Sequence, residues 1–384
     1  VFWMTNRIRS TRISRPDNVH KMDTQEPMPK RKSERPIGID LFAGAGGLSL
    51  GFEQAGFDIA AAVEIDPVHC AVHKFNFPNT AIIPHSVEGL SARFIREAAA
   101  IGDREIDCVF GGAPCQGFSL IGHRVLDDPR NKLVLEFVRI VSELGARTFV
   151  FENVKGLTVG KHKAFLRELV EAFDDAGYAV RTPWKVLNAG HYDTPQSRER
   201  LILFGALKGE KLPSYPEPTT NIAGRKKRFD GLPYGPSCEE ALGDLPDADR
   251  FEDLFNGDTV KGVSNTLRAG TDGARGAFTS PRPIHYSYNR CVSVREMARL
   301  HGFPDWFRLH ATKWHGARQI GNAVPPPLAR KIASAVLDAL GIEPRRPEGT
   351  VKLGDPSLLN LDLSQASGHF EIEPPPSRRD RKSG

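Results

Sequence analysis

The stretch Ile106-Asp-Cys-Val-Phe-Gly-Gly-Ala-Pro-Cys-Gln-Gly-Phe-Ser119 decides the fold, because an apolar run there ends in a glycine-rich turn. The β-branched and aromatic residues of 106–110 are typical of a buried parallel strand. In open α/β sheets, ligands bind beyond the carboxyl ends of such strands. Cys115 stands at this position behind the rigid Pro114, so its thiol could act as a nucleophile. A cysteine alone is more often a buried core residue, so the rest of the chain must decide.

Segments of the same kind recur on both sides of this stretch. Apolar runs typical of strands cover residues 37–42, 57–64, 148–151, 178–187 and 200–205. Helical periodicity occurs at residues 48–55, 133–144, 161–176 and 327–340, and Ser293 and Glu296 form a capping box that begins a further helix. This alternation predicts an α/β fold with a doubly wound, mostly parallel, Rossmann-like sheet and right-handed crossovers.

The pattern breaks down in three places. Residues 206–285 are rich in Pro, Gly and polar residues, and they predict a second, smaller, loop-rich domain. Residues 1–35 and 343–384 lack periodicity and are basic or Pro-rich, which predicts a disordered basic arm and a disordered tail. The main domain then consists of residues 36–205 and, after the loop-rich domain, residues 286–342.

Charge and cysteine content limit the classes of function. The chain has 52 Lys and Arg and 47 Asp and Glu, but residues 1–35 hold nine of the former and four of the latter, so the remainder, with 43 of each, is formally neutral. A nucleic-acid surface on the folded part must therefore be a local basic patch. The five cysteines are scattered without a C-x-x-C pair, which argues against a disulfide framework and a zinc site. No apolar run approaches the roughly 20 residues that span a bilayer, so we expect a cytoplasmic protein without membrane contact.

Two further patterns indicate a ligand site at one edge of the sheet. Glu64 and Asp66 follow the glycines of residues 43–47 by about 20 positions, where nucleoside-binding folds place a carboxylate for ribose hydroxyls. The turn lacks G-x-G-x-x-G, which fits a nucleoside without pyrophosphate at least as well as a dinucleotide. The strand 148–151 also delivers Glu152 to the same edge as Cys115, so a carboxyl group is expected beside the thiol.

Gln196, Arg198 and Arg200 stand at alternate positions of an extended segment, so their side chains point to one side. By itself this arrangement fits a solvated strand edge as well as a functional site. With these residues, however, the chain resembles the DNA (cytosine-5) methyltransferases from Ile37 to about Leu340. The motifs, in the family's order, are Asp40-Leu-Phe-Ala-Gly-Ala-Gly-Gly47, Glu64-Ile-Asp66, Gly112-Ala-Pro-Cys-Gln116, Glu152-Asn-Val154, Gln196-Ser-Arg-Glu-Arg200, Arg290 with Arg295-Glu296, and Gln319-Ile-Gly-Asn322. The resemblance implies S-adenosylmethionine as methyl donor, double-stranded DNA as substrate and residues 206–285 as a target-recognition domain.

The chemistry of such a reaction needs a nucleophile, because carbon 5 of cytosine is unreactive until a thiolate adds to carbon 6. Cys115 takes this role, and the target base must leave the duplex to reach it. A protonated Glu152 would stabilise the charge that addition pushes onto the ring, which predicts a buried carboxyl group with a raised pKa near Cys115. The resemblance implies that Arg198 and Arg200 orient the site, with Arg200 at the base carbonyl. The sequence does not identify the base that removes the carbon 5 proton.

The resemblance also implies a donor site. Phe42 would pack on the adenine and Glu64 would hold the ribose, while the glycine turn lets the backbone approach the methionine part. The positions that match the family's donor contacts are Phe42, Gly44, Gly46, Gly47, Leu48, Glu64, Ile65, Ser86, Val87, Pro114, Leu133, Asn322 and Val324. Ser86 departs from the family's usual Asp, which binds the adenine amine, and we expect a weaker or water-mediated contact there.

Other functions remain open at this point. A tRNA cytosine methyltransferase has the same core, and so would a catalytically inactive DNA-binding relative. The size of the region 206–285 favours DNA over tRNA, and the presence of Cys115 argues against an inactive relative. A nicotinamide dehydrogenase is disfavoured because nothing around Cys115 suits hydride transfer. We expect a monomer with a cognate restriction endonuclease as functional partner, while the target sequence depends on loop geometry that the sequence does not reveal.

Overall fold

The computed structural model describes residues 35–114, 131–160, 162–225, 228–245, 264, 266–267, 285–288, 292–345 and 350–374. The predictions for residues 1–34, for Cys115 and, within the loop-rich region, for residues 226–227, 246–263, 265 and 268–284 lie outside these ranges. No helix in the described ranges is long and apolar enough to cross a membrane. The same ranges hold no group of three or more His, Cys, Asp or Glu side chains that could bind a metal ion.

Eight strands form one mixed sheet: β1 Ile37–Leu41, β2 Asp58–Val63, β3 Ala81–Ile83, β4 Cys108–Gly111, β5 Thr148–Val154, β6 Tyr178–Val180, β7 Lys185–Asn188 and β8 Glu199–Leu207. Their order is β3-β2-β1-β4-β5-β8-β6, and β7 also pairs with β8. The strands from β3 to β5 pair in parallel, whereas β8 is antiparallel to β5, β6 and β7. The predicted mostly parallel sheet is therefore confirmed, with β8 running against its neighbours.

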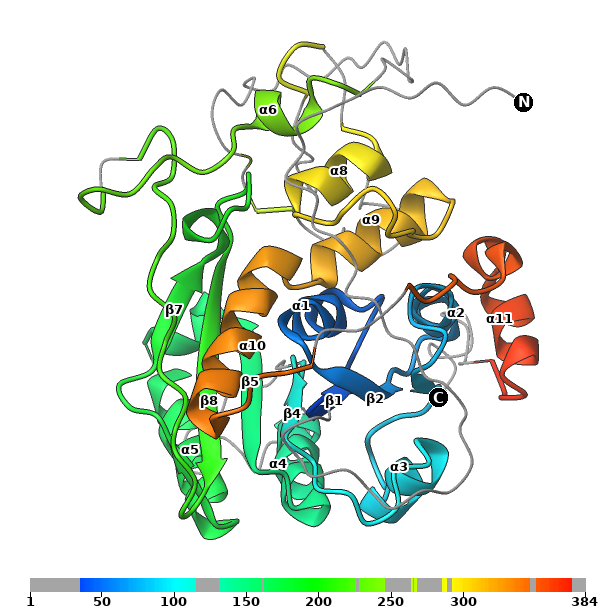
Figure 1. Ribbon diagram of the computed structural model, residues 1–384. Helices are drawn as coiled ribbons and strands as arrows, with labels where there is room; N and C mark the ends of the chain where they lie inside the picture. Colours follow the sequence, from blue (N-terminus) through cyan, green and yellow to red (C-terminus); the bar gives the residue numbers. More distant parts are fainter. Residues whose placement is uncertain are drawn as a thin grey trace.

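Side chains of the central strands alternate between two apolar cores. In β4, Val109 packs with α4 (Lys132–Leu144) and α5 (His162–Asp175), whereas Phe110 packs with α1 (Gly47–Ala55) and α10 (Pro326–Leu340). Figure 1 shows α1 and α10 next to each other on one face of the sheet. Because helices cover both faces, the strand reads as a continuous apolar run, and the doubly wound arrangement is confirmed.

The other described helices are α2 Pro67–Asn76, α3 Ala92–Ala98, α6 Cys238–Leu242, α8 Val294–Leu300, α9 Lys313–Asn322 and α11 Leu363–His369, with 3₁₀ turns η4 Lys155–Thr158, η5 Ala189–His191 and η7 Pro356–Asn360. The predicted capping box is present at α8, where Ser293 Oγ accepts from the Glu296 N–H and the Glu296 carboxylate accepts from the Ser293 N–H. A third apolar core joins α6 of the loop-rich region to α8 and α9. The boundaries of that region stay predictions.

The C-terminal segment differs from its prediction. Disorder is predicted from residue 343 onwards, yet η7 and α11 fold within residues 350–374 and lie against α2 (Figure 1). Leu358 is buried with Ala71 and Phe75 of α2, and the Gly354 N–H donates to the Phe75 carbonyl at 2.9 Å. The prediction is wrong for these residues, because their order comes from an apolar surface far away in the sequence, which local composition does not reveal.

Candidate active site and donor site

The turn that leads towards Cys115 lies directly over the carboxyl group of Glu152. The Asn153 side-chain amide donates to the Ala113 carbonyl at 2.9 Å, which ties this turn to the end of β5. A Cβ atom on Gly112 would lie 2.4 Å from Glu152 Oε2, so a residue with a side chain would collide with the carboxyl group. Glycine at this position therefore permits the close approach of the two segments.

Glu152 combines burial with a close cationic partner. The residue is 9% exposed, and Arg200 Nε lies 2.8 Å from its Oε1. Burial raises the pKa of Glu152, while the guanidinium groups of Arg200 and Arg198 oppose the shift. The predicted burial of Glu152 and the direction of its pKa shift are confirmed. A carboxyl group balanced in this way can take up a proton when a suitable ligand arrives.

The segment from Gln196 to Arg200 presents alternate side chains to the protein interior. Gln196 and Arg198 are fully buried, and the Arg200 side chain is 11% exposed. The intervening Glu199 points outwards and pairs with Lys155. This alternation is the one expected from the sequence, and it rules out a simple solvated strand edge for the inward-facing residues.

Arg198 joins three segments of the chain. Its two terminal nitrogens donate to the carbonyls of Leu267 at 2.7 Å and Gly321 at 2.6 Å. Leu267 belongs to the loop-rich region, whereas Gly321 lies in the last turn of α9. Among the described residues, Arg198 Nε has no hydrogen-bond partner. Arg198 thus fixes the walls around Glu152 and Arg200 rather than closing the ion pair itself.

His301 is a site residue that the sequence reasoning missed. It is fully buried, with Nδ1 3.0 Å from Gln196 Nε2 and Nε2 3.0 Å from the Ala323 carbonyl. Burial, together with the charge of Arg198, holds the pKa of His301 well below its usual value, so the ring is neutral. A neutral ring satisfies both contacts when Nε2–H donates to Ala323 and Nδ1 accepts from Gln196. The polar residue within the apolar stretch 300–303 was the available signal.

The donor side of the sheet edge is organised around Glu64, directly after β2. Its Oε2 accepts from the Gly44 N–H and its Oε1 from the Asp66 N–H, both at 2.8 Å. Asp66 caps α2 and lies 3.3 Å from Arg318, so its carboxylate is already engaged. Of the two predicted acids, Asp66 therefore has a structural role. The Glu64 carboxylate is held in place and keeps free lone pairs, which suits two ribose hydroxyls.

The loop between β1 and α1 forms a cradle beside Glu64. Phe42 has φ +60°, which is unusual for a residue with a side chain and is typical of functional sites. Gly44 has φ +53°, and a Cβ atom there would meet nothing within 4 Å, so this turn borders open space. α1 has Gly46 as its N-cap residue, which offers no side-chain cap. Its first N–H groups and the open turn fit the anionic end of a ligand such as S-adenosylmethionine.

Other predicted donor residues fall into exposed and buried sets. Ile65 is 61% exposed beside Glu64. Leu48 is buried in the core against α10, which leaves its backbone as the group that can face a ligand. Asn322 ends α9, and a Cβ atom on Gly47 would lie 2.6 Å from the Val324 carbonyl. The glycine turn and residues 322–324 are therefore packed directly together.

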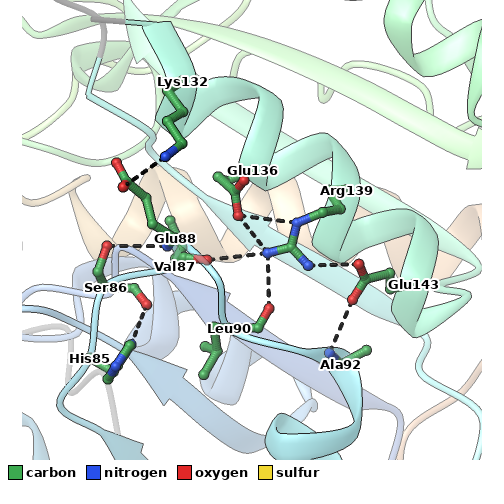
Figure 2. Close-up of polar contacts among 10 residues, drawn as sticks. All are labelled: His85, Ser86, Val87, Glu88, Leu90, Ala92, Lys132, Glu136, Arg139 and Glu143. Carbon is green, nitrogen blue, oxygen red and sulfur yellow. Dashed lines mark hydrogen bonds and ion pairs between the residues drawn. The ribbon is translucent and has the colours of Figure 1, made fainter. Parts of the chain in front are cut away.

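The segment with Ser86 and Val87 follows β3 at the same edge (Figure 2). Ser86 Oγ accepts from the Glu88 N–H at 3.1 Å, so the serine hydroxyl is used in a local turn. Val87 is buried in the core against which Phe42 and Leu133 also pack. The departure from the family's Asp thus removes a carboxylate, while the apolar contacts around it remain.

Comparison with known proteins agrees with this geometry. The family model for C-5 cytosine-specific DNA methylase matches residues 38–259 and 247–338. The Type II methyltransferase M.XorII of Xanthomonas oryzae pv. oryzae is 48% identical, over 88% of this chain and 93% of its own length. The Type II methyltransferase M1.HphI of Haemophilus parahaemolyticus is 36% identical, over 78% of this chain and 86% of its own length.

Solved structures show the same architecture. The crystal structure of the Schizosaccharomyces pombe methyltransferase Dnmt2 aligns with a TM-score of 0.56 over 80% of this chain and 100% of its own, at 19% identity, which shows the shared fold alone. The matched family model covers most of the chain. The chain therefore belongs to the C-5 cytosine-specific DNA methylase family, and it transfers the methyl group of S-adenosylmethionine to carbon 5 of cytosine in DNA.

Proposed function

We propose that Cys115 and Glu152 carry out this methyl transfer, with Arg200 holding Glu152 and contacting the base. The observation that carries this assignment is the buried Glu152 carboxyl group, paired with Arg200 at 2.8 Å beneath the turn that precedes Cys115. Because carbon 6 is inaccessible in a stacked duplex, the target cytosine is extruded into this site. Arg198 is a positioning residue, since its terminal nitrogens bind backbone carbonyls.

The proposed chemistry uses two side chains, Cys115 as the nucleophile and Glu152 as the acid. The Cys115 thiolate adds to carbon 6 of the ring and raises the electron density at carbon 5 and N3. Glu152, protonated in the bound state, donates to N3 and stabilises this charge, which its burial makes possible. Loss of the carbon 5 proton later restores the ring and releases the thiolate. S-adenosylmethionine supplies an electrophilic methyl group on a sulfonium centre.

We further assign donor binding to the cradle around Glu64. Glu64 would hold the ribose hydroxyls, because two backbone N–H groups fix its carboxylate. Phe42 and the exposed Ile65 would flank the adenine, and the open turn at Gly44 would admit the methionine part. Pro114 follows β4, Leu133 packs on the core that contains Val87, and Val324 lies against Gly47, so these residues would complete the walls.

A trapping experiment tests the catalytic assignment. DNA that contains 5-fluorocytosine cannot lose its carbon 5 substituent, so the thiolate adduct should persist and remain visible on a denaturing gel. Wild-type protein and Cys238→Ala, which removes a buried thiol elsewhere, should both form the adduct, and Cys115→Ser should not. A Cys115→Ser protein that still forms the adduct would remove the assignment. Labelled-methyl transfer to duplex DNA but not to tRNA would also distinguish the two substrates.

We also propose that the protein acts as a monomer alongside a restriction endonuclease of the same sequence specificity. The two relatives named above are Type II methyltransferases, and a methyl group on carbon 5 lies in the major groove, where proteins read sequence. Bisulfite sequencing of DNA from cells that express the chain should reveal one short methylated sequence. Light scattering should give a mass of about 42.3 kDa. Scattered methylation, or the mass of a dimer, would contradict the corresponding part.

A further inference from the structure

The segment Ser86–Leu90, defined here as the donor loop, follows one of the two shortest strands of the sheet. β3 has three residues and pairs with β2 alone, at the outer end of the strand order. Few ladder hydrogen bonds therefore reach this part of the chain. Its backbone needs further partners if it is to keep one position beside the donor.

Those partners come from Arg139 on α4 (Figure 2). Arg139 Nη2 donates to the carbonyls of Val87 at 3.3 Å and Leu90 at 2.9 Å. Two carboxylates of the same helix hold the guanidinium from either side: Glu136 bonds its Nε and Nη2, and Glu143 bonds its Nη1 at 2.7 Å. The planar guanidinium directs its N–H groups towards all of these acceptors, and the two hydrogens of Nη2 are shared among the two carbonyls and Glu136.

Two further side chains of α4, Glu143 and Lys132, also contact this part of the chain. Glu143 Oε2 accepts from the Ala92 N–H at 3.2 Å. Ala92 is the first residue of α3, where an N–H group has no acceptor within the helix. Lys132, at the start of α4, pairs with Glu88 at 3.1 Å. The Lys132–Glu88 pair is exposed and contributes little, so Arg139 and its two glutamates provide most of the restraint.

The position of the donor loop matters because the Ser86 hydroxyl is short and is bonded within the loop's own turn. Ser86 Oγ accepts from Glu88 N–H, and Val87 is packed in the core shared with Phe42 and Leu133. The Ser86 hydroxyl keeps its O–H donor and a second lone pair, so the loop acts on a ligand through where this hydroxyl and the backbone lie. Arg139 holds that backbone by the carbonyls of Val87 and Leu90.

We propose that Arg139 is a positioning residue that sets the affinity for S-adenosylmethionine by holding the donor loop, with Glu136 and Glu143 as its supports. The proposal rests on the donor site proposed above. Arg139 lies on a different element from Glu152, Arg198 and Arg200. Its loss should therefore change the affinity for the donor and leave kcat nearly unchanged. A purely structural role would instead lower the amount of active enzyme without changing the KM for the donor.

The test is steady-state kinetics of DNA methylation with varied donor. Arg139→Met and Arg139→Lys should each raise the KM for S-adenosylmethionine about tenfold, the equivalent of one lost hydrogen bond to a charged group, with kcat within about twofold of wild type. The lysine variant keeps the charge but lacks the fork, so it should not rescue affinity. Arg93→Met, which removes an exposed i,i+4 ion pair on the neighbouring α3, is the matched control and should leave KM unchanged.

Two outcomes would overturn the proposal: an unchanged donor KM in the Arg139 variants, or a loss of kcat with KM unaltered. If Arg139→Met does not fold, as seen by thermal unfolding without donor, Arg139→Lys decides alone. Calorimetric titration of wild-type protein with S-adenosylmethionine tests the donor site separately from the role of Arg139. Absence of binding to wild type would remove the donor site itself, whereas equal binding by wild type and both Arg139 variants would remove only the role of Arg139.

Discussion

The catalytic side and the donor side of the sheet edge are built in different ways. Around Glu152, the polar groups are buried side chains, and Arg198 and His301 connect segments that are distant in the sequence. Around Glu64, backbone N–H groups hold the carboxylate, and a half-exposed Arg139 cluster holds the neighbouring loop. Buried charged networks fail sharply when one member is removed, whereas backbone and surface contacts fail gradually. We therefore expect large effects on kcat and stability on the catalytic side, and moderate effects on donor affinity on the other.

The largest effect should follow from Glu152→Gln, which keeps the shape of the side chain but cannot supply the proton. We expect kcat for DNA methylation to fall by roughly 10³-fold, within the range for removal of a general acid. Calorimetry should show donor affinity within twofold of wild type. A matched loss of kcat and donor affinity would contradict the division between the two sides.

Removal of the Arg198 guanidinium should mainly reduce stability. Arg198→Met leaves the buried carbonyls of Leu267 and Gly321 without their donors, and we expect the free energy of unfolding in urea to fall by about 3 kcal/mol. Arg96→Met is the matched control, because Arg96 likewise donates to backbone carbonyls, three against the two of Arg198, but is half-buried. Its effect should be about 1 kcal/mol. Equal losses in the two variants would show that burial of the Arg198 network does not increase its contribution to the free energy of unfolding.

On the donor side, Glu64→Gln should act on affinity alone. The amide presents a donor where the Gly44 or Asp66 N–H now finds an acceptor, so the side chain loses its fixed orientation. We expect the KM for S-adenosylmethionine to rise about 10- to 30-fold, with kcat changed less than about threefold. Glu97→Gln, in an exposed pair on α3, provides the control. A drop in kcat without a change in KM would place Glu64 on the catalytic side.

A pH experiment sharpens the view that the catalytic network needs a neutral His301. The folded-state pKa of His301 is depressed by burial, so the unfolded chain binds the proton more tightly than the folded protein. Stability from this residue is full above its unfolded pKa of about 6.5 and falls by about 1.4 kcal/mol per pH unit below it. His301→Gln can donate and accept in the same way and should lose about 2 kcal/mol less stability than wild type between pH 6.5 and 5. Urea unfolding of wild type and His301→Gln at both pH values measures the difference.

The smallest effect should come from Lys132→Met. Its partner Glu88 lies at the surface of the donor loop, and exposed pairs contribute about 0–1 kcal/mol. We expect less than a twofold change in donor KM, against about tenfold for Arg139→Met. A change as large as that of Arg139 would mean that charge at the loop, rather than the guanidinium fork, sets donor affinity.

Particular elements show why some features were predictable. The apolar run before Gly111 and the capping box at Ser293 are local signals, and the structure contains the strand and the helix that they predict. α9 was missed because Gly316 and Gly321 weaken its local signal, and the helix depends on burial of Ala317 and Ile320. The antiparallel direction of β8 relative to β7 also has a signal in the sequence, namely the short connection between them. Residues 189–198 are too few for the crossover that a parallel neighbour of β7 requires.

The sequence by itself determined the sheet, the order of its motifs and the reaction, because periodicity and motif residues are local properties of the chain. It also predicted the burial of Glu152 from the chemistry that a dry carboxyl group must perform. Only the tertiary structure decided that Arg198 and His301 join the loop-rich region, α9 and the segment just before β8, and that Arg139 bonds the donor loop. It alone also ordered residues 350–374 against α2. These contacts link residues that are tens to hundreds of positions apart, and their partners are mostly backbone carbonyls, which every residue type carries and no sequence pattern marks.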